Sequence, residues 1–245
     1  MKTIYGYAID VKDVIASPQT KEYRHKIQYP ISETKDSKRI LAGYYKQASH
    51  EIVNIKYCPI QPKYCDDIID FIRSKAFELK VRGYDEKKHS GDLRHVVIRA
   101  SRLHNKCIVT LVINSHRPLD KVKNLANQIY SNFEEIDGIS INYNPTKTNL
   151  ILGEKSELII GNGFIEEQLC DKVFKISTNT FFQINPWTAN NIFKYVKDFI
   201  QKEFDKPYKK FYTRKEAVGI PELVIYFGKN ELCLKGFPFT LLEHC

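Results

Sequence analysis

The chain of 245 residues contains no Cys-x-x-Cys pair, and its six cysteines are scattered singly along the sequence. Closely spaced cysteine pairs are typical of structural zinc sites, so the sequence shows no complete zinc site. A chain of this length can bury a core without disulfide bonds. We therefore expect reduced thiols, as in a cytoplasmic protein.

Long apolar runs are also missing. No stretch approaches the roughly eighteen consecutive apolar residues that indicate a membrane-spanning helix. The first residues, MKTIYGYAIDVKD, have neither the basic head nor the apolar stretch of a secretory signal peptide. The sequence thus predicts a cytoplasmic protein without a membrane partner. Its 42% hydrophobic and 12% aromatic residues suffice for one large domain or two modest ones.

Acidic residues are fewer than basic ones, 29 against 38, which gives a net charge of +9. A cationic excess favours a polyanionic partner such as nucleic acid, because lysine and arginine neutralise phosphates. The excess is moderate and spread along the chain, and a generally lysine-rich composition would explain it as well. Charge alone leaves both interpretations open.

Hydrophobic periodicity predicts the class of fold. Apolar residues recur at close to the helical period of 3.6 over residues 63–79 and 119–133, which predicts two amphipathic helices. Short apolar segments bounded by polar turns predict paired strands before, between and after these helices. We expect an α+β domain with a mostly antiparallel sheet and two or three packed helices. The expected strands cover residues 40–45, 51–57, 93–100, 107–114, 138–143, 148–152 and 157–160.

Residues 173–185, VFKISTNTFFQIN, combine a strand pattern, a polar turn and an aromatic pair, and a helical pattern follows them. Phe181 and Phe182 can anchor the turn in a core, which leaves Gln183 and Asn185 at its exposed end. Amide side chains both donate and accept hydrogen bonds but do not titrate. The segment can therefore bind a polar ligand without proton transfer. An ordinary strand-to-helix corner with satisfied amides is the alternative.

At these residues the sequence resembles the RNA (uracil-5-)-methyltransferase family, whose members carry Phe-x-Ile-Ser-x-x-Ser-Phe-x-Gln-x-Asn here. The resemblance extends over about residues 15–204. It implies methylation of carbon 5 of uridine in RNA, ribosomal RNA first, with S-adenosylmethionine as the cofactor. It also implies that Gln183 contacts that cofactor. Other similar segments are Tyr-Arg-His-Lys at 23–26, Cys-Pro-Ile-Gln at 58–61, GDLRHVVIR at 91–99 and TNLILG at 148–153.

Four basic residues in family-like elements are candidate RNA contacts. Arg24 and Lys26 lie on an expected edge strand, where the family has Tyr-Arg-Asn-Lys, and Arg94 and Arg99 lie in the GDLRHVVIR segment. Basic side chains on strands can contact RNA phosphates. A solvated face for the first pair, and hydrogen bonds to loop carbonyls for the second, are the alternatives.

Cys58 corresponds to a cysteine that in many family members is the last of four ligands to an iron-sulfur cluster. No cysteine precedes Cys58. Because the other three ligands should lie upstream, one chain cannot supply a cluster with four thiolates. We treat Cys58 as a metal ligand by resemblance only, and expect a buried thiol and no cluster.

The resemblance stops after Phe204. The family continues with a glycine-rich turn that approaches the methyl donor, an Asn-Pro-Pro segment and a nucleophilic cysteine. Residues 205–245 contain none of these patterns, and Cys233 and Cys245 lack the flanking context of the nucleophile. We assign no catalytic residue, and expect a truncated or aberrant start of a methyltransferase domain and a chain that is inactive alone.

These observations predict a central α+β RNA-side domain over residues 1–170, a connecting strand and helix over 171–204, and a divergent or truncated tail over 205–245. The leading hypothesis is an RNA uracil-carbon-5 methyltransferase. A non-catalytic RNA-binding module and a gene remnant are the alternatives. The sequence identifies neither the target uridine nor the oligomeric state.

Overall fold

A mixed β-sheet organises the molecule. The computed structural model describes residues 13–203, 224–228 and 231–235. Its main sheet has seven strands in the order β3-β2-β1-β4-β5-β6-β7. β5 and β6 pair in parallel, and the other neighbouring strands are antiparallel. The strands are β1 (Lys26–Glu33), β2 (Ile40–Tyr45), β3 (Ile52–Asn54), β4 (Leu93–Ser101), β5 (Lys106–Ile113), β6 (Ile136–Tyr143) and β7 (Lys155–Gly161).

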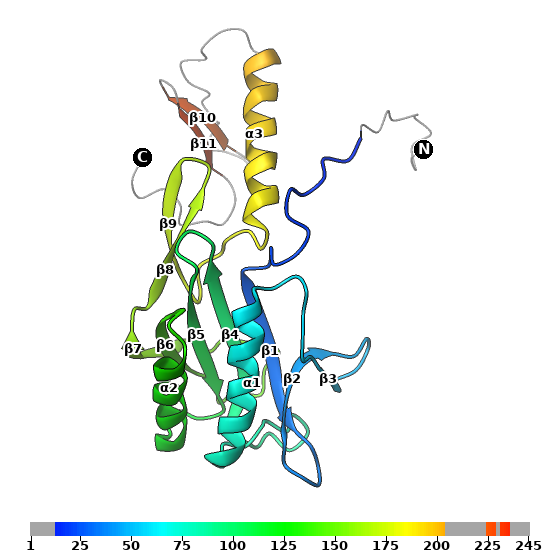
Figure 1. Cartoon of the computed structure of the whole chain (residues 1–245), viewed down its shortest axis with the longest axis vertical. Coiled ribbons are helices and arrows are strands. Elements are labelled where there is room, and N and C mark those ends of the chain that lie inside the picture. Colours follow the sequence, from blue (N-terminus) through cyan, green and yellow to red (C-terminus); the bar gives the residue numbers. More distant parts are fainter. Residues whose placement is uncertain (1–12, 204–223, 229–230, 236–245) are drawn as a thin grey trace, which may run out of the picture.

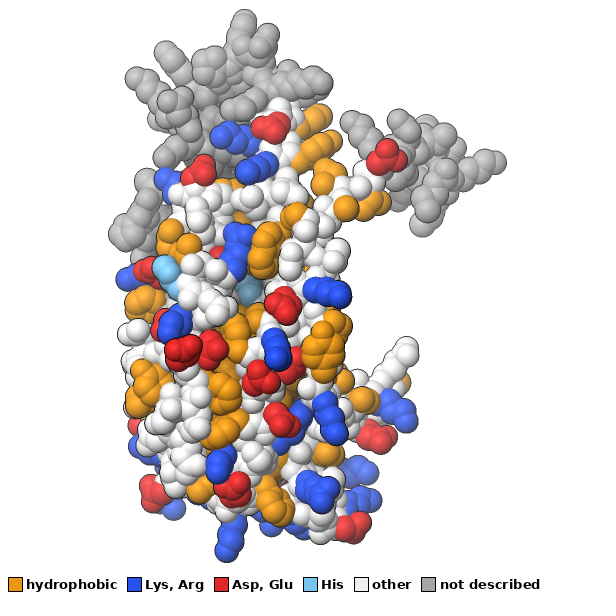
Figure 2. Space-filling view, viewed as in Figure 1, with side chains coloured by type: hydrophobic (Ala, Val, Ile, Leu, Met, Phe, Trp, Pro, Cys, Tyr) orange, Lys and Arg blue, Asp and Glu red, His pale blue; other side chains and the backbone are white. Residues whose placement is uncertain are grey.

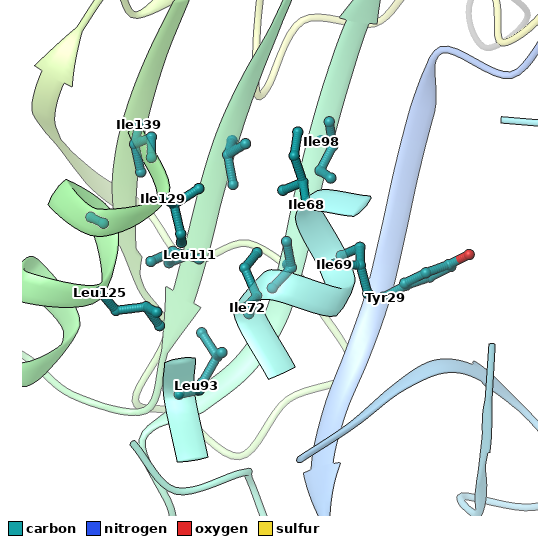
Figure 3. Packing of buried hydrophobic residues seen from close by; sticks show 14 of the residues in the cluster. Tyr29, Ile68, Ile69, Ile72, Leu93, Ile98, Leu111, Leu125, Ile129 and Ile139 are labelled. Carbon is teal, nitrogen blue, oxygen red and sulfur yellow. The ribbon is translucent and has the colours of Figure 1, made fainter. Parts of the chain in front are cut away.

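Two helices, α1 (Lys63–Glu78) and α2 (Asp120–Asn132), cover one face of this sheet (Figure 1). α2 forms the crossover between the parallel strands β5 and β6, a connection that needs a helix-length segment. Both helices bury one apolar stripe against the strands (Figure 3). The stripe residues are Ile68, Ile69, Ile72 and Ala76 on α1 and Val122, Leu125, Ala126 and Ile129 on α2.

The opposite face of the sheet is covered at one end by a hairpin of β8 (Phe164–Leu169) and β9 (Lys172–Ser177). A second, smaller core forms there from Ile108, Ile165, Ile176 and Phe182. Because both of its faces are covered, all residues of β4 are buried. This explains why the sequence of β4 shows little alternation between apolar and polar residues.

Helix α3 (Pro186–Glu203) begins beside the β8–β9 hairpin and extends away from the main sheet (Figure 1). Its outer side exposes Ile192, Tyr195 and Phe199. A short hairpin follows, formed by β10 (Val224–Gly228) and β11 (Glu231–Lys235). In the described part of the chain, no helix combines the length and apolar character needed to cross a membrane.

The structure confirms the expected α+β class, the mostly antiparallel sheet and both helices. Residues 148–152 do not form the expected strand, because Asn144 donates to the carbonyls of Leu150 and Ile151 and Arg94 donates to that of Thr148, groups that strand pairing would use. The expected strand at 51–57 shortens to β3. The division into 1–170, 171–204 and 205–245 stays a prediction, and most of its last segment lies outside the described residues.

We expect Asn142→Ala to lower the free energy of unfolding by about 1 to 3 kcal/mol, measured by urea denaturation. The buried amide of Asn142 donates to Gly153 O, Lys155 O and Ser156 Oγ and accepts from the Gly153 amide. Its loss leaves these groups without their partner. The control Asn132→Ala removes an exposed amide at the end of α2. Equal losses in both variants would contradict this role of Asn142.

Candidate functional site

A cavity of about 370 Å³ lies between the main sheet and the start of α3. Residues 181–185 and the first turns of α3 form one wall, and β1 and β4 form the other. The cavity brings together Gln183, Lys26 and Arg99, three residues that the sequence analysis singled out separately. Lys26 and Arg99 are direct cross-strand partners in the β1–β4 pairing.

The wall formed by residues 181–185 follows a tight turn after β9. The Ser177 amide donates to Thr180 Oγ1, and the chain then reverses so that Phe182 is buried. The Phe182 ring contacts those of Phe174 and His25, with centroids 5.9 and 5.2 Å away. Phe181 and Gln183 remain exposed at the cavity.

The two amides of this segment have different surroundings. Asn185 caps α3, because its Oδ1 accepts from the Thr188 amide at 3.1 Å, and its Nδ2 donates to Ser17 Oγ. Asn185 thus has the satisfied amide that the sequence analysis gave as an alternative. The Gln183 side chain has no hydrogen-bond partner among the described residues, and it lines the cavity.

Arg99 is the most unusual charged residue of the cavity. It is 1% exposed, and one guanidinium nitrogen, Nη2, donates to the carbonyl of Thr180. Its Nε and Nη1 have no partner, and no carboxylate pairs with it within the described ranges. Burial lowers the pKa of Arg99 to about 10, so the group remains cationic at neutral pH. A buried cation without a counterion is costly, which makes the cavity suited to an anionic group.

Lys26 adds a second positive charge beside Arg99. Burial lowers the pKa of Lys26, and the charges of Arg99 and Arg24 lower it further. An anion in the cavity would relieve this repulsion. Arg24 itself does not line the cavity, and its Nε donates to the carbonyl of Lys26 at 3.0 Å.

Arg94 lies at the other end of β4 and does not reach the cavity. It is buried, and its guanidinium donates to the carbonyls of Asn144, Thr146 and Thr148 at 2.6, 2.7 and 3.2 Å. These are the loop-carbonyl contacts that the sequence analysis left open as an alternative. A contact between Arg94 and RNA stays a prediction.

Cys58 is a buried residue near the start of α1. Its amide donates to Asp66 Oδ2 at 3.3 Å, and the side chain of Gln61 donates to the other carboxylate oxygen of Asp66. Among the residues that the structure describes, no three His, Cys, Asp or Glu side chains gather as a metal site would require. The role of Cys58 as a cluster ligand stays an inference from resemblance.

A second, smaller cavity lies next to the first, with His25, Arg102, Glu167 and Trp187 among its lining residues. No pattern in the sequence indicated this cavity. Glu167 is fully buried and pairs with Arg102 at 3.0 Å. Glu167 shares the inward side of β8 with Ile165, and this alternation was the feature of the sequence that could have identified it. The sequence does not show where the hairpin that buries Glu167 packs.

The visible surface offers no comparable concentration of charge. Figure 2 shows lysine and arginine side chains interspersed with acidic ones over the face that carries α1 and α2. Large single-sign patches are the usual electrostatic mark of nucleic-acid binding. The paired cations of the cavity are therefore a more specific indication than the net charge.

No family model matches the chain. It is 35% identical over 179 residues to an uncharacterized RNA methyltransferase of Halalkalibacterium halodurans, with 73% of this chain and 38% of the relative covered. A similar protein of Fusobacterium nucleatum is 32% identical, with 86% of this chain and 45% of the relative covered. The chain thus spans less than half the length of the curated relatives it matches.

A solved structure is also similar. The Pyrococcus abyssi tRNA (uracil-54, C5)-methyltransferase, in complex with S-adenosyl-L-homocysteine, has a TM-score of 0.60 and 27% sequence identity. The match covers 74% of this chain and 42% of that one. The similarity supports the α+β architecture described above.

Two variants on β4 separate a ligand-binding arginine from a structural one. We expect Arg94→Met to lower the free energy of unfolding by about 1 to 3 kcal/mol, because three carbonyls lose their donor. Arg99→Met should cost less, or stabilise the protein, since it removes a buried charge that lacks a counterion. Urea denaturation of both variants measures this. A larger loss for Arg99→Met would show that Arg99 serves mainly the fold.

Proposed function

This chain belongs to the RNA (uracil-5-)-methyltransferase family, and we propose that it takes part in methylating carbon 5 of uridine in RNA, with S-adenosylmethionine as the methyl donor. One observation carries the proposal. The cavity at the start of α3 combines an unpartnered amide, Gln183, with the neighbouring cations Lys26 and Arg99. It therefore offers groups for a polar ligand and for an anionic one.

On the RNA side, Lys26 and Arg99 would hold a phosphate at the cavity. The two unpartnered nitrogens of Arg99, Nε and Nη1, lie on different edges of the guanidinium plane, so each can donate to a separate anionic oxygen. Arg24, next to Lys26, would extend the contact along the RNA backbone. Arg94 would contribute through the 144–148 loop that it holds in place. We take ribosomal RNA as the first candidate substrate and transfer RNA, the substrate class of the similar P. abyssi tRNA methyltransferase, as the second.

On the donor side, Gln183 would contact S-adenosylmethionine, which supplies the methyl group. A single neutral hydrogen bond contributes only about 0.5 to 1.5 kcal/mol, whereas immobilising a ligand costs about 4 kcal/mol or more. Gln183 can thus orient the donor but cannot hold it by itself. We assign the RNA contacts to residues 1–170 and the donor contact to the connecting segment 171–204. No catalytic residue is assigned.

A non-catalytic RNA-binding module is the second candidate. It is favoured because the residues that line the cavity in the described part of the chain include neither a cysteine nor a carboxylate. Incubation of the chain with methyl-labelled S-adenosylmethionine and ribosomal or transfer RNA transcripts distinguishes the two. Label in 5-methyluridine supports the methyltransferase, whereas RNA binding without label supports the module. A gene remnant would show neither.

We expect RNA binding to depend on salt through the two cations of the cavity. In a titration with single-stranded RNA at several salt concentrations, Lys26→Ala and Arg99→Met should each flatten the plot of log affinity against log salt by about 0.7. The control Lys63→Ala removes an exposed charge at the start of α1 and should leave the slope unchanged. If the salt dependence of both cavity variants equals that of the unaltered chain, Lys26 and Arg99 do not contact the RNA phosphates.

We also expect calorimetric titration of the chain with S-adenosylmethionine to give no saturable heat at micromolar concentrations. The physical reason is the small contribution of a single amide contact. If saturable binding appears and Gln183→Ala abolishes it, the prediction is wrong. Residues beyond the described part of the first cavity would then complete a donor site.

A further inference from the structure

The second cavity, of about 190 Å³, adjoins the site just discussed. The neighbouring, mutually tilted rings of His25 and Phe182 lie between the two spaces, since His25 lines the second cavity and Phe182 lines the first. The two cavities thus share one wall. Two adjacent groups of one ligand can therefore occupy the two cavities at the same time.

His25 provides a hydrogen-bonding edge without a partner. It is 5% exposed, and neither ring nitrogen has a hydrogen-bond partner among the described residues. Burial, followed by the charges of Arg99, Arg102 and Lys26, lowers the pKa of His25 to about 3. The imidazole is therefore neutral at pH 7, with one nitrogen that donates and one that accepts. Leaving such a group unpaired is unfavourable, and a matching ligand edge would provide its partners.

Trp187, at the start of α3, provides an aromatic surface in the same cavity. The Arg102 guanidinium lies 4.9 Å from the ring centroid on one side of the indole. Arg102 is held there by Glu167 Oε1 at 3.0 Å and by the carbonyl of Gln168 at 2.6 Å. The indole is thus fixed in orientation. Proteins that bind single-stranded RNA use such aromatic rings to stack unpaired bases.

The charges of the cavity select against an anion. Glu22 and Glu167 are among the residues that line it, and the cation Arg102 is already paired with Glu167. A phosphate would therefore meet an additional negative charge from Glu22. The volume corresponds to about six water molecules at roughly 30 Å³ each, enough for one planar ring but too small for a whole nucleotide. These features fit a neutral planar ligand that both donates and accepts hydrogen bonds.

We propose that the second cavity is a nucleobase subsite, which receives an unpaired base of the RNA next to the phosphate held at the first cavity. His25 binds the edge of this base and Trp187 stacks on its face. The inference rests on the proposed function, because it requires RNA at the first cavity. It goes further by assigning recognition of a base to residues outside that cavity.

The chain contains a single tryptophan, Trp187, so its fluorescence reports on this cavity alone. The experiment titrates the full chain with hexauridylate, and with a hexamer of the same charge in which every base is removed. We expect hexauridylate to quench the fluorescence and the abasic hexamer to bind more weakly without quenching it. Equal quenching by both would overturn the subsite, because phosphates alone would then account for the signal.

Two variants test the base contact. His25→Phe keeps an aromatic ring against Phe182 but removes both nitrogens, and should weaken hexauridylate binding about 2- to 10-fold, the range expected for one hydrogen bond. It should leave binding of the abasic hexamer unchanged. The matched control is His95→Phe, because His95 is another buried neutral histidine with an unpartnered Nδ1, and it lines neither cavity. Equal losses in both variants, or none in His25→Phe, would overturn the inference.

Gln19→Ala covers the case in which His25→Phe does not fold. Gln19 lies in a loop at the edge of the second cavity, so its removal should weaken hexauridylate binding without affecting the abasic hexamer. An unchanged affinity in this variant counts against the subsite. If neither hexamer binds, the proposed function fails together with the inference. If both bind with the same salt dependence and the same affinity, only the subsite fails.

Discussion

The pairing of β1 with β4 determines where the site lies. Their register places Lys26 opposite Arg99, which fixes two positive charges side by side on the face that the β8–β9 hairpin and the 178–185 turn cover. The turn closes over Arg99 through its contact with the carbonyl of Thr180. If β1 paired with β4 one residue out of register, the side chain of Lys26 would point to the opposite face of the sheet, because successive side chains on a strand point to opposite sides. The cavity, its charge and the position of α3 therefore depend on this single pairing.

Two cavities with different properties lie next to each other at the start of β1. Lys26 and Gln28 of β1 line the first cavity, whereas His25, the residue before β1, lines the second. The first contains two cations without a described counterion, and in the second the cation Arg102 is neutralised by Glu167. A charged group suits the first cavity and a neutral one suits the second. A nucleotide chain presents both kinds of group at short intervals, in its phosphates and in its bases.

The sequence predicted the elements better than their assembly. Helical periodicity located α1 and α2, since an amphipathic stripe is a local property of the chain. The strand expected at 148–152 was wrong, because the side chains of Asn144 and Arg94 bind its carbonyls, and only the fold brings Arg94 close to Thr148. Gln183, Lys26 and Arg99 were named from separate motifs. Their meeting in one cavity depends on register and on the path of the turn, which periodicity does not encode.

The two arginines of β4 show what distinguishes a structural charge from one kept for a ligand. Both are buried on the same strand, so exposure and sequence context do not separate them. Arg94 has three carbonyl acceptors and lies 4.5 Å from the ring of Tyr84, which together offset the cost of its burial. Arg99 has one carbonyl acceptor and two unpaired nitrogens beside an open cavity. Without a ligand, the second arrangement is unfavourable for folding, so binding of an anion would supply the interactions that the fold itself leaves out.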